Sequence, residues 1–132
     1  MPSKMYEAGM KIRREVLSDA YVDAAMKNVD EFNREFQELI TEFCWGSVWG
    51  RKGLSRKQRS LNNLCMLAIL NRPHEFKAHV RGALRNGVTV REIQETLMQI
   101  SIYAGVPTGV DAFRNAREVL KEEKIDTSKS ID

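Results

Sequence analysis

Apolar side chains recur at intervals of three and four residues along most of this chain, the spacing that places them on one face of an α-helix. The pattern predicts a short helix over 20–27 and six longer helices, over 5–17, 31–43, 55–70, 73–86, 89–104 and 108–120. No segment shows the strict apolar and polar alternation of a half-buried strand. Because the connections are short, neighbouring helices should run antiparallel. The sequence therefore predicts an all-α, single-domain bundle of about six helices.

Local signals mark several of the expected helix ends. Thr89 followed three residues later by Glu92 is the pattern of a capping box at a helix start. Asn86 and Gly87 should close the preceding helix, because glycine readily adopts the left-handed backbone found after a last turn. Asp30 is a suitable cap for the helix that begins at about residue 31.

The segment from Cys44 to Gly50 breaks the helical pattern. It predicts a turn or a short helical link, followed by a loop over 51–54. Before this break, glutamates surround one face of the helix, and the other face is an apolar stripe by which the helix should pack. The stripe consists of Phe32, Phe36, Leu39, Ile40 and Phe43.

Length and composition are those of one ordinary globular domain. We assign the 132 residues to a single domain over 1–132, with a frayed tail over 121–132. The net charge of +3 comes without a clustered basic face or motif, which argues against a nucleic-acid partner. The longest apolar run, over 64–70, is too short to span a membrane. Cys44 and Cys65 lack disulfide or metal-ligand spacing, and the first residues do not form a signal peptide, so we expect a cytoplasmic protein.

His79 is the first residue that could carry chemistry. It lies on the apolar side of its predicted helix, where an imidazole could donate or accept a proton near neutral pH. A structural histidine with its hydrogen bonds satisfied by neighbours would give the same pattern. Periodicity leaves both interpretations open.

Arginines and aromatic residues supply the other candidates. Arg51 and Arg59 flank a loop and could bind a carboxylate through paired hydrogen bonds, or form ordinary ion pairs. Trp45 and Trp49 could line a pocket or anchor an oligomer interface. Tyr103, near a helix end, could donate its phenol to a ligand or belong to the core.

Several segments resemble those of the carboxymuconolactone decarboxylase family. The resemblance lies in Tyr6 to Leu17, Trp45-Gly46-x-x-Trp49-x-Arg51-x-Gly53-Leu54, Arg59-Ser60-Leu61, His79-x-x-x-Ala83-x-x-Asn86-Gly87-Val88-Thr89 and Tyr103-x-Gly105-Val106-Pro107. The segments follow one register over about residues 5–120. Together they are more specific than any one of them alone.

The resemblance implies an alkylhydroperoxidase D-like helical fold and a carboxy-lyase. Such an enzyme decarboxylates 4-carboxymuconolactone to the β-ketoadipate enol-lactone in protocatechuate catabolism. The resemblance implies no cofactor and no metal, since the lactone carbonyl can accept the electrons itself. It also implies a homo-oligomer, namely a hexamer, that binds a small anionic lactone.

The chemistry of that reaction suggests a role for each candidate. His79 would donate the proton or polarise the lactone carbonyl, with Arg59 as the second catalytic residue. Arg51 or Arg59 would anchor a substrate carboxylate. Trp45, Trp49 and Tyr103 would contact the substrate as pocket walls.

Two other functions fit the same scaffold. A thiol peroxidase of the wider alkylhydroperoxidase D-like superfamily needs C-x-x-C-x-x-x-H, but with its histidine on His79 the cysteine positions carry Arg72 and Glu75. The missing thiols argue against this alternative. A non-catalytic helical oligomerisation protein would keep the scaffold without needing the chemistry of the candidate residues.

Overall fold

The computed structural model describes residues 2–132. Within this range the chain forms seven α-helices and one π-helix and contains no strand, which confirms the predicted all-α fold class. It divides into two compact units, one ending at Arg56 and one running from Lys57 to Asp132, and each is described by itself. No helix in the described range is long and apolar enough to cross a membrane.

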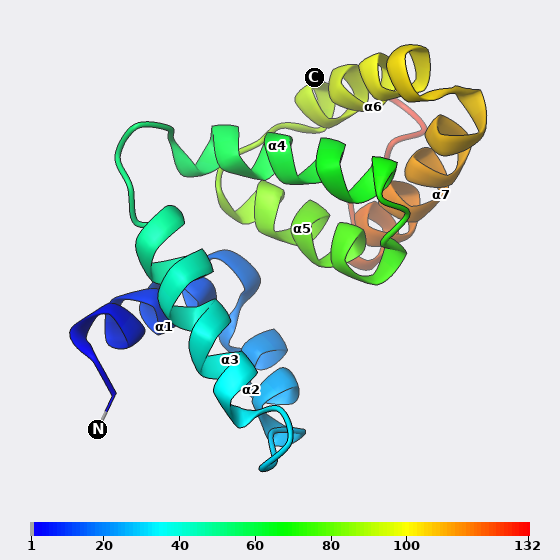
Figure 1. The fold of residues 1–132 in the computed structure, drawn as a ribbon. Helices are drawn as coiled ribbons and strands as arrows, with labels where there is room; N and C mark the ends of the chain where they lie inside the picture. Colours follow the sequence, from blue (N-terminus) through cyan, green and yellow to red (C-terminus); the bar gives the residue numbers. More distant parts are fainter. Residues whose placement is uncertain (1) are drawn as a thin grey trace. The chain divides into compact units, whose positions relative to one another are not determined.

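The first unit contains α1 (Lys4–Leu17), α2 (Asp19–Lys27), α3 (Arg34–Ile40) and η1 (Thr41–Val48), a π-helix that continues α3 without a break (Figure 1). For residues 44–50 the sequence left open a turn or a short helical link; the structure has helix through Val48, wound as a π-helix, followed by a turn at Trp49 and Gly50. The backbone N–H of Trp49 still donates to the carbonyl oxygen of Cys44 at 2.9 Å, the five-residue span of a π-helix.

The helix predicted from residue 31 begins three residues later. The carboxylate of Asp30 accepts backbone hydrogen bonds from Phe32 at 2.9 Å and Asn33 at 3.2 Å. The side-chain oxygen of Asn33 accepts one from the N–H of Asp30 at 2.8 Å. These bonds stabilise a closed turn, so α3 starts at Arg34 with Asn33 as its N-cap.

Helix α1 and η1 cross with their backbones in direct contact. A Cβ atom added to Gly9 would overlap the carbonyl oxygen of Thr41, and one added to Gly46 would lie 2.6 Å from the carbonyl oxygen of Met5. Only a residue without a side chain permits this approach at either position. The two glycines therefore fix where α1 meets the π-helix.

A charged side chain is buried beside this crossing. Arg13 of α1 is only 5% exposed, and its Nη1 donates to Gln37 Oε1 at 3.1 Å and Thr41 Oγ1 at 3.3 Å. Burial lowers the pKa of this guanidinium because its hydrogen-bonding partners are neutral. The apolar core of the unit is formed by Val16, Leu17, Val22, Trp45 and Trp49.

The apolar stripe predicted on this helix is not its packing face. The opposite side of α3 and η1, which carries Gln37 and Thr41, contacts Arg13 of α1. Periodicity reveals that a helix is amphipathic, but it does not identify the element that covers the apolar face. The stripe side chains more than half exposed in the described structure are Phe32, Phe36, Leu39 and Phe43.

The second unit contains nearly all of α4 (Arg56–Ile69) together with α5 (Pro73–Arg85), α6 (Val90–Ala104) and α7 (Val106–Glu122). Helix α7 packs against both α5 and α6 (Figure 1). All four helices contribute to one buried apolar cluster. Its largest fully buried members are Leu64, Phe76, Val80, Ile93, Leu97 and Val119.

The predicted ends of α5 and α6 are confirmed. Thr89 Oγ1 accepts the backbone N–H of Glu92, and the Glu92 carboxylate accepts that of Thr89, which completes the capping box. Asn86 is the C-cap of α5, and Gly87 has a φ of +88°. At the other end of the unit, α7 includes Lys121 and Glu122, where the sequence places the start of a frayed tail.

Candidate functional site

His79 lies on α5 and faces α4. The Nδ2 atom of Asn63 is 3.3 Å from His79 Nδ1. An amide nitrogen donates hydrogen bonds, so Nδ1 accepts here, and the hydrogen of the neutral ring is then carried by Nε2. The neutral ring thus carries its one N–H group at Nε2.

Arg59 lies on the same helix as Asn63. It precedes Asn63 by one helical turn, so both side chains leave the same face of α4. The next residue, Ser60, is fully buried and accepts a hydrogen bond from Asn86 Nδ2 at 2.9 Å. We call Ser60, Asn63, His79 and Asn86 the polar seam between α4 and α5.

Enclosure in this seam changes the acidity of His79. Burial lowers the pKa of the ring from its ordinary 6.5 to about 4, and the negative charge of Glu75 opposes this only in part. The imidazole is therefore neutral at physiological pH. A neutral imidazole is a weak acid but a good hydrogen-bond donor, so the geometry favours polarising a carbonyl oxygen over delivering a proton.

The lowered pKa predicts a specific dependence of stability on pH. Above pH 6.5 His79 is neutral in the folded and unfolded states, whereas between pH 6.5 and about 4 only the unfolded state binds the proton. The free energy of unfolding should thus fall by about 1 kcal/mol per pH unit as the pH drops through this window. Urea unfolding of the wild type and His79→Phe, with His74→Phe as the control, measures this slope. If His79→Phe showed the same slope as the wild type, the lowered pKa of His79 would not be the cause of this pH dependence.

Tyr103 lies away from the polar seam, near the end of α6. Its side chain is 85% exposed and lines an open groove of about 380 Å³ between α4 and α6. The other groove residues are uncharged, including Gln58, Asn62 and Gln99. The phenol is accessible there, but His79 does not belong to the lining of this groove.

The remaining candidates belong to the first unit. Trp45 and Trp49 are 5% and 6% exposed, with ring centroids 5.0 Å apart and planes tilted by 31°. Arg51 is exposed in the loop that follows η1. The structure thus brings the two tryptophans together and His79 against Asn63, while Arg51 and Tyr103 lie elsewhere in their respective units.

Asn63 is the residue of the polar seam that the sequence interpretation missed. It contacts a histidine 16 positions away on another helix, and helical periodicity gives no information on such a pair. One sequence signal could have pointed to Asn63: this polar amide lies directly before Leu64, a core position of the same helix, and one turn after Arg59. A polar side chain flanking a buried leucine needs a hydrogen-bonding partner.

Comparison with known proteins gives consistent matches. Residues 34–121 match the carboxymuconolactone decarboxylase family. The chain is 40% identical over 117 residues to 4-carboxymuconolactone decarboxylase of Acinetobacter baylyi, covering 89% of this chain and 87% of that protein. It is 43% identical over 109 residues to nitrosuccinic acid decarboxylase of Metarhizium robertsii, covering 83% and 76%. An uncharacterized 15.0 kDa protein of Paracoccus denitrificans is 28% identical over 123 residues.

The helical fold and these matches define the class of protein: it is an all-α carboxy-lyase. The chain belongs to the carboxymuconolactone decarboxylase family. The matched region begins at α3 and extends to Lys121 in α7, so it includes the polar seam and every candidate site residue.

Proposed function

We propose that the protein decarboxylates 4-carboxymuconolactone, or a close analogue, to the corresponding enol-lactone without a cofactor. The observation that carries this proposal is the 40% identity, over most of both chains, to a protein named for that activity. We place the reaction in the cytoplasm, in the breakdown of aromatic compounds through protocatechuate. The polar seam contributes the neutral hydrogen-bond donor that such a reaction needs.

The substrate itself can carry the reaction electronically. It is a five-membered unsaturated lactone with a carboxylate and an acetate arm on one ring carbon. When the bond to the carboxylate breaks, carbon dioxide leaves and the electron pair moves through the ring double bond to the lactone carbonyl oxygen. The resulting dienolate takes up one proton on the carbon next to the carbonyl, which gives the enol-lactone. Negative charge on the carbonyl oxygen is therefore what the enzyme must stabilise.

His79 is the residue we assign to that oxygen. We assign the Nε2 hydrogen as the donor in the reaction, since Nδ1 faces the Asn63 amide and the ring hydrogen is therefore on Nε2. Burial keeps the ring neutral, with a pKa of about 4, so the donor is present throughout the neutral range. A proton from solvent then completes the reaction at carbon.

Arg59 is the residue we assign to the acetate arm. A guanidinium forms paired hydrogen bonds with a carboxylate, and Arg59 leaves the same face of α4 as Asn63. Arg51, Trp45, Trp49 and Tyr103 remain predicted substrate contacts. Replacement of Arg59 should therefore affect KM more than replacement of Arg51.

Nitrosuccinate is a second candidate substrate, favoured by the 43% identity to nitrosuccinic acid decarboxylase. The electronic principle is the same, because loss of carbon dioxide from a carbon that bears a nitro group leaves its electrons on the nitro oxygens. A hydrogen-bond donor at Nε2 of His79 would stabilise that charge equally well. Comparing kcat/KM for the two substrates decides between them.

Activity should persist after exhaustive treatment with a chelator and without any added cofactor, because the lactone is its own electron acceptor. The measurement is the ultraviolet absorbance change on adding the lactone, prepared in situ from its muconate precursor. Loss of activity with the chelator and recovery with a metal ion would show that the cofactor-free proposal is wrong. Absence of turnover on both lactone and nitrosuccinate would reject both substrates.

We also propose that the protein is a homo-oligomer, with six copies as the family resemblance implies. Large apolar side chains are exposed in both units, including Phe32 at 96% and Ile102 at 81%. Exposed large apolar side chains in this number favour coverage by another copy of the chain. Sedimentation velocity at micromolar concentration should show a species several times heavier than 15.2 kDa. A single 15.2 kDa species would contradict the proposal.

A further inference from the structure

The chain after α7 folds back over α6 and α7. The backbone N–H of Ile125 donates to the carbonyl oxygen of Leu120 at 2.9 Å, which turns the chain at the helix end. Arg91 of α6 then holds the carboxylate of Asp132 through two hydrogen bonds, Nε to Oδ1 at 2.8 Å and Nη2 to Oδ2 at 2.9 Å. A paired arginine and carboxylate contact of this kind fixes orientation as well as distance.

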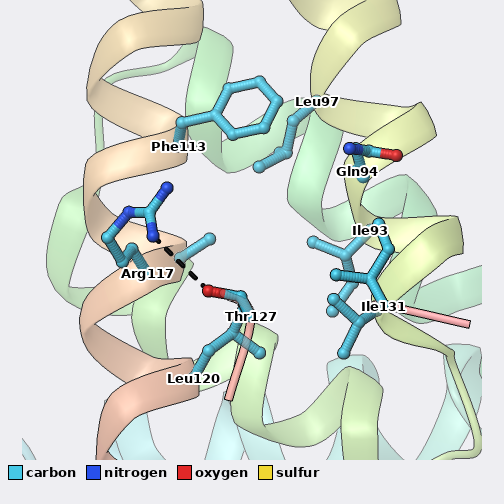
Figure 2. Close-up of a pocket in the computed structure, with 10 residues that line it drawn as sticks. Ile93, Gln94, Leu97, Phe113, Arg117, Leu120, Thr127 and Ile131 are labelled. Carbon is cyan, nitrogen blue, oxygen red and sulfur yellow. Dashed lines mark hydrogen bonds between the residues drawn. The ribbon is translucent and has the colours of Figure 1, made fainter. Parts of the chain in front are cut away.

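Beneath this returning segment lies a pocket of about 150 Å³ (Figure 2). Its walls are mostly apolar and come from α6, α7 and the returning segment, with Ile93, Leu97, Phe113, Leu120 and Ile131 among them. A cavity of about this volume lined by leucine, isoleucine and phenylalanine is large enough to hold a benzene ring.

A positive charge stands at the edge of this pocket. Arg117 lines it, and its only described hydrogen bond is a long one of 3.4 Å from Nη1 to Thr127 Oγ1 (Figure 2). Arg117 forms no ion pair within residues 2–132, whereas its neighbour Arg114 pairs with Asp111 at 2.7 Å. Gln94 adds a second polar group, and because its oxygen already accepts from Arg91 at 2.8 Å, its NH₂ group remains to donate. A guanidinium and an amide donor beside apolar walls are suited to an anionic group attached to an apolar ring.

We propose that this pocket, separate from the polar seam, binds a small aromatic carboxylate. The ring enters between Ile93, Leu97 and Ile131, and the carboxylate stays at the mouth of the pocket on Arg117. Both parts of the ligand are needed: the ring fills apolar volume, and the charge meets a cation that has no acidic partner in the described chain. The proposal does not depend on the reaction that the polar seam supports.

A titration with benzoate tests this site. Methyl-resolved NMR of the full-length protein should show saturable shifts in the resonances of Ile93, Leu97 and Ile131 at millimolar benzoate. Benzyl alcohol, with the same ring and no charge, should bind at least about fivefold more weakly. Acetate, which has the charge and no ring, should cause no shift beyond that of an equal concentration of chloride.

Two variants separate the proposed contact from general effects of charge. Arg117→Gln should weaken benzoate binding at least about fivefold. Arg114→Gln removes a neighbouring positive charge that does not line the pocket and should leave the Kd unchanged. Absence of saturable shifts in the wild type would overturn the site. Equal binding of benzoate and benzyl alcohol, no effect of Arg117→Gln, or shifts centred on the polar seam would each overturn the proposal as well.

Discussion

Replacing His79 by alanine should lower kcat for lactone decarboxylation by a hundredfold or more, on the order of what removing one oxyanion hydrogen-bond donor costs elsewhere. The Nε2 hydrogen is the proposed donor to the carbonyl oxygen on which the negative charge develops. Alanine leaves a small gap in the polar seam, and the helical fold should persist. The measurement is single-turnover kinetics, with circular dichroism to verify the fold.

His74→Ala is the matched control, because His74 is an exposed histidine near the start of the same helix. It should turn over within a few-fold of the wild type. His79→Gln keeps an N–H donor in a similar place and should recover part of the loss. If His79→Ala were as active as the control, a water molecule held by an arginine, or Tyr103, would become the better candidate for the role.

The pH profile distinguishes the two possible roles of His79. With a pKa of about 4, a neutral donor gives a rate that is constant through the neutral range and falls only as the pH approaches 4. A protonated histidine acting as the acid would instead give a rate that declines as the pH rises above that pKa. A decline of that kind, abolished by His79→Ala, would reject the hydrogen-bond role.

Gly9→Ala should cause the largest loss of stability among single substitutions in the first unit, more than about 3 kcal/mol. The new Cβ atom would overlap the backbone oxygen of Thr41, which is held in the helix and cannot move aside like a flexible side chain. Relief of this overlap requires α1 to move away from η1. That movement would expose the interior of the first unit around Arg13.

Gly53→Ala is the control, because a Cβ atom there would meet no atom within 4 Å. Tryptophan fluorescence reports on the first unit selectively, since the protein has two tryptophans and both, Trp45 and Trp49, belong to that unit. Thermal unfolding followed at these residues should shift strongly in Gly9→Ala and little in Gly53→Ala. Equal melting temperatures for the two variants would show that the crossing is not tightly packed.

Much of the second unit could be predicted from the sequence because its signals are local. The capping box at Thr89 and the helix end at Asn86-Gly87 depend on residues within one turn of each other. The family could be identified because its characteristic segments retain one order and register along the chain. Neither inference required knowledge of tertiary contacts.

The first unit was harder to predict because its form depends on contacts between distant residues. The π-helix lies where Gly9 and Gly46 let two backbones touch, and nothing in the local pattern of residues 41–48 requires the wider helical turn. The apolar stripe around Phe36 was correctly recognised as one face of a helix. The residues that cover this face could not be inferred from its period.

The candidate site was only partly predictable, because some of its features are local in sequence and others depend on contacts between helices. His79 could be chosen from residue type and position, but its acidity could not, because the pKa depends on burial and on Asn63 from another helix. Trp45 and Trp49 lie in the segment that breaks the helical pattern in the sequence, so their direct ring contact in the structure was not predicted. Their burial involves packing against α1, about 30 residues earlier in the sequence, which local periodicity cannot predict.

The connection between α5 and α6 has a consequence for how the chain folds. Only Asn86, Gly87, Val88 and Thr89 separate the two helices, and the N–H of Val88 donates back to the carbonyl oxygen of Ala83 at 2.9 Å. Closing so short a loop costs little chain entropy, and its contacts have low sequence separation. Because Val88 also joins the buried apolar cluster, this connection should become ordered together with the core of the second unit and not after it.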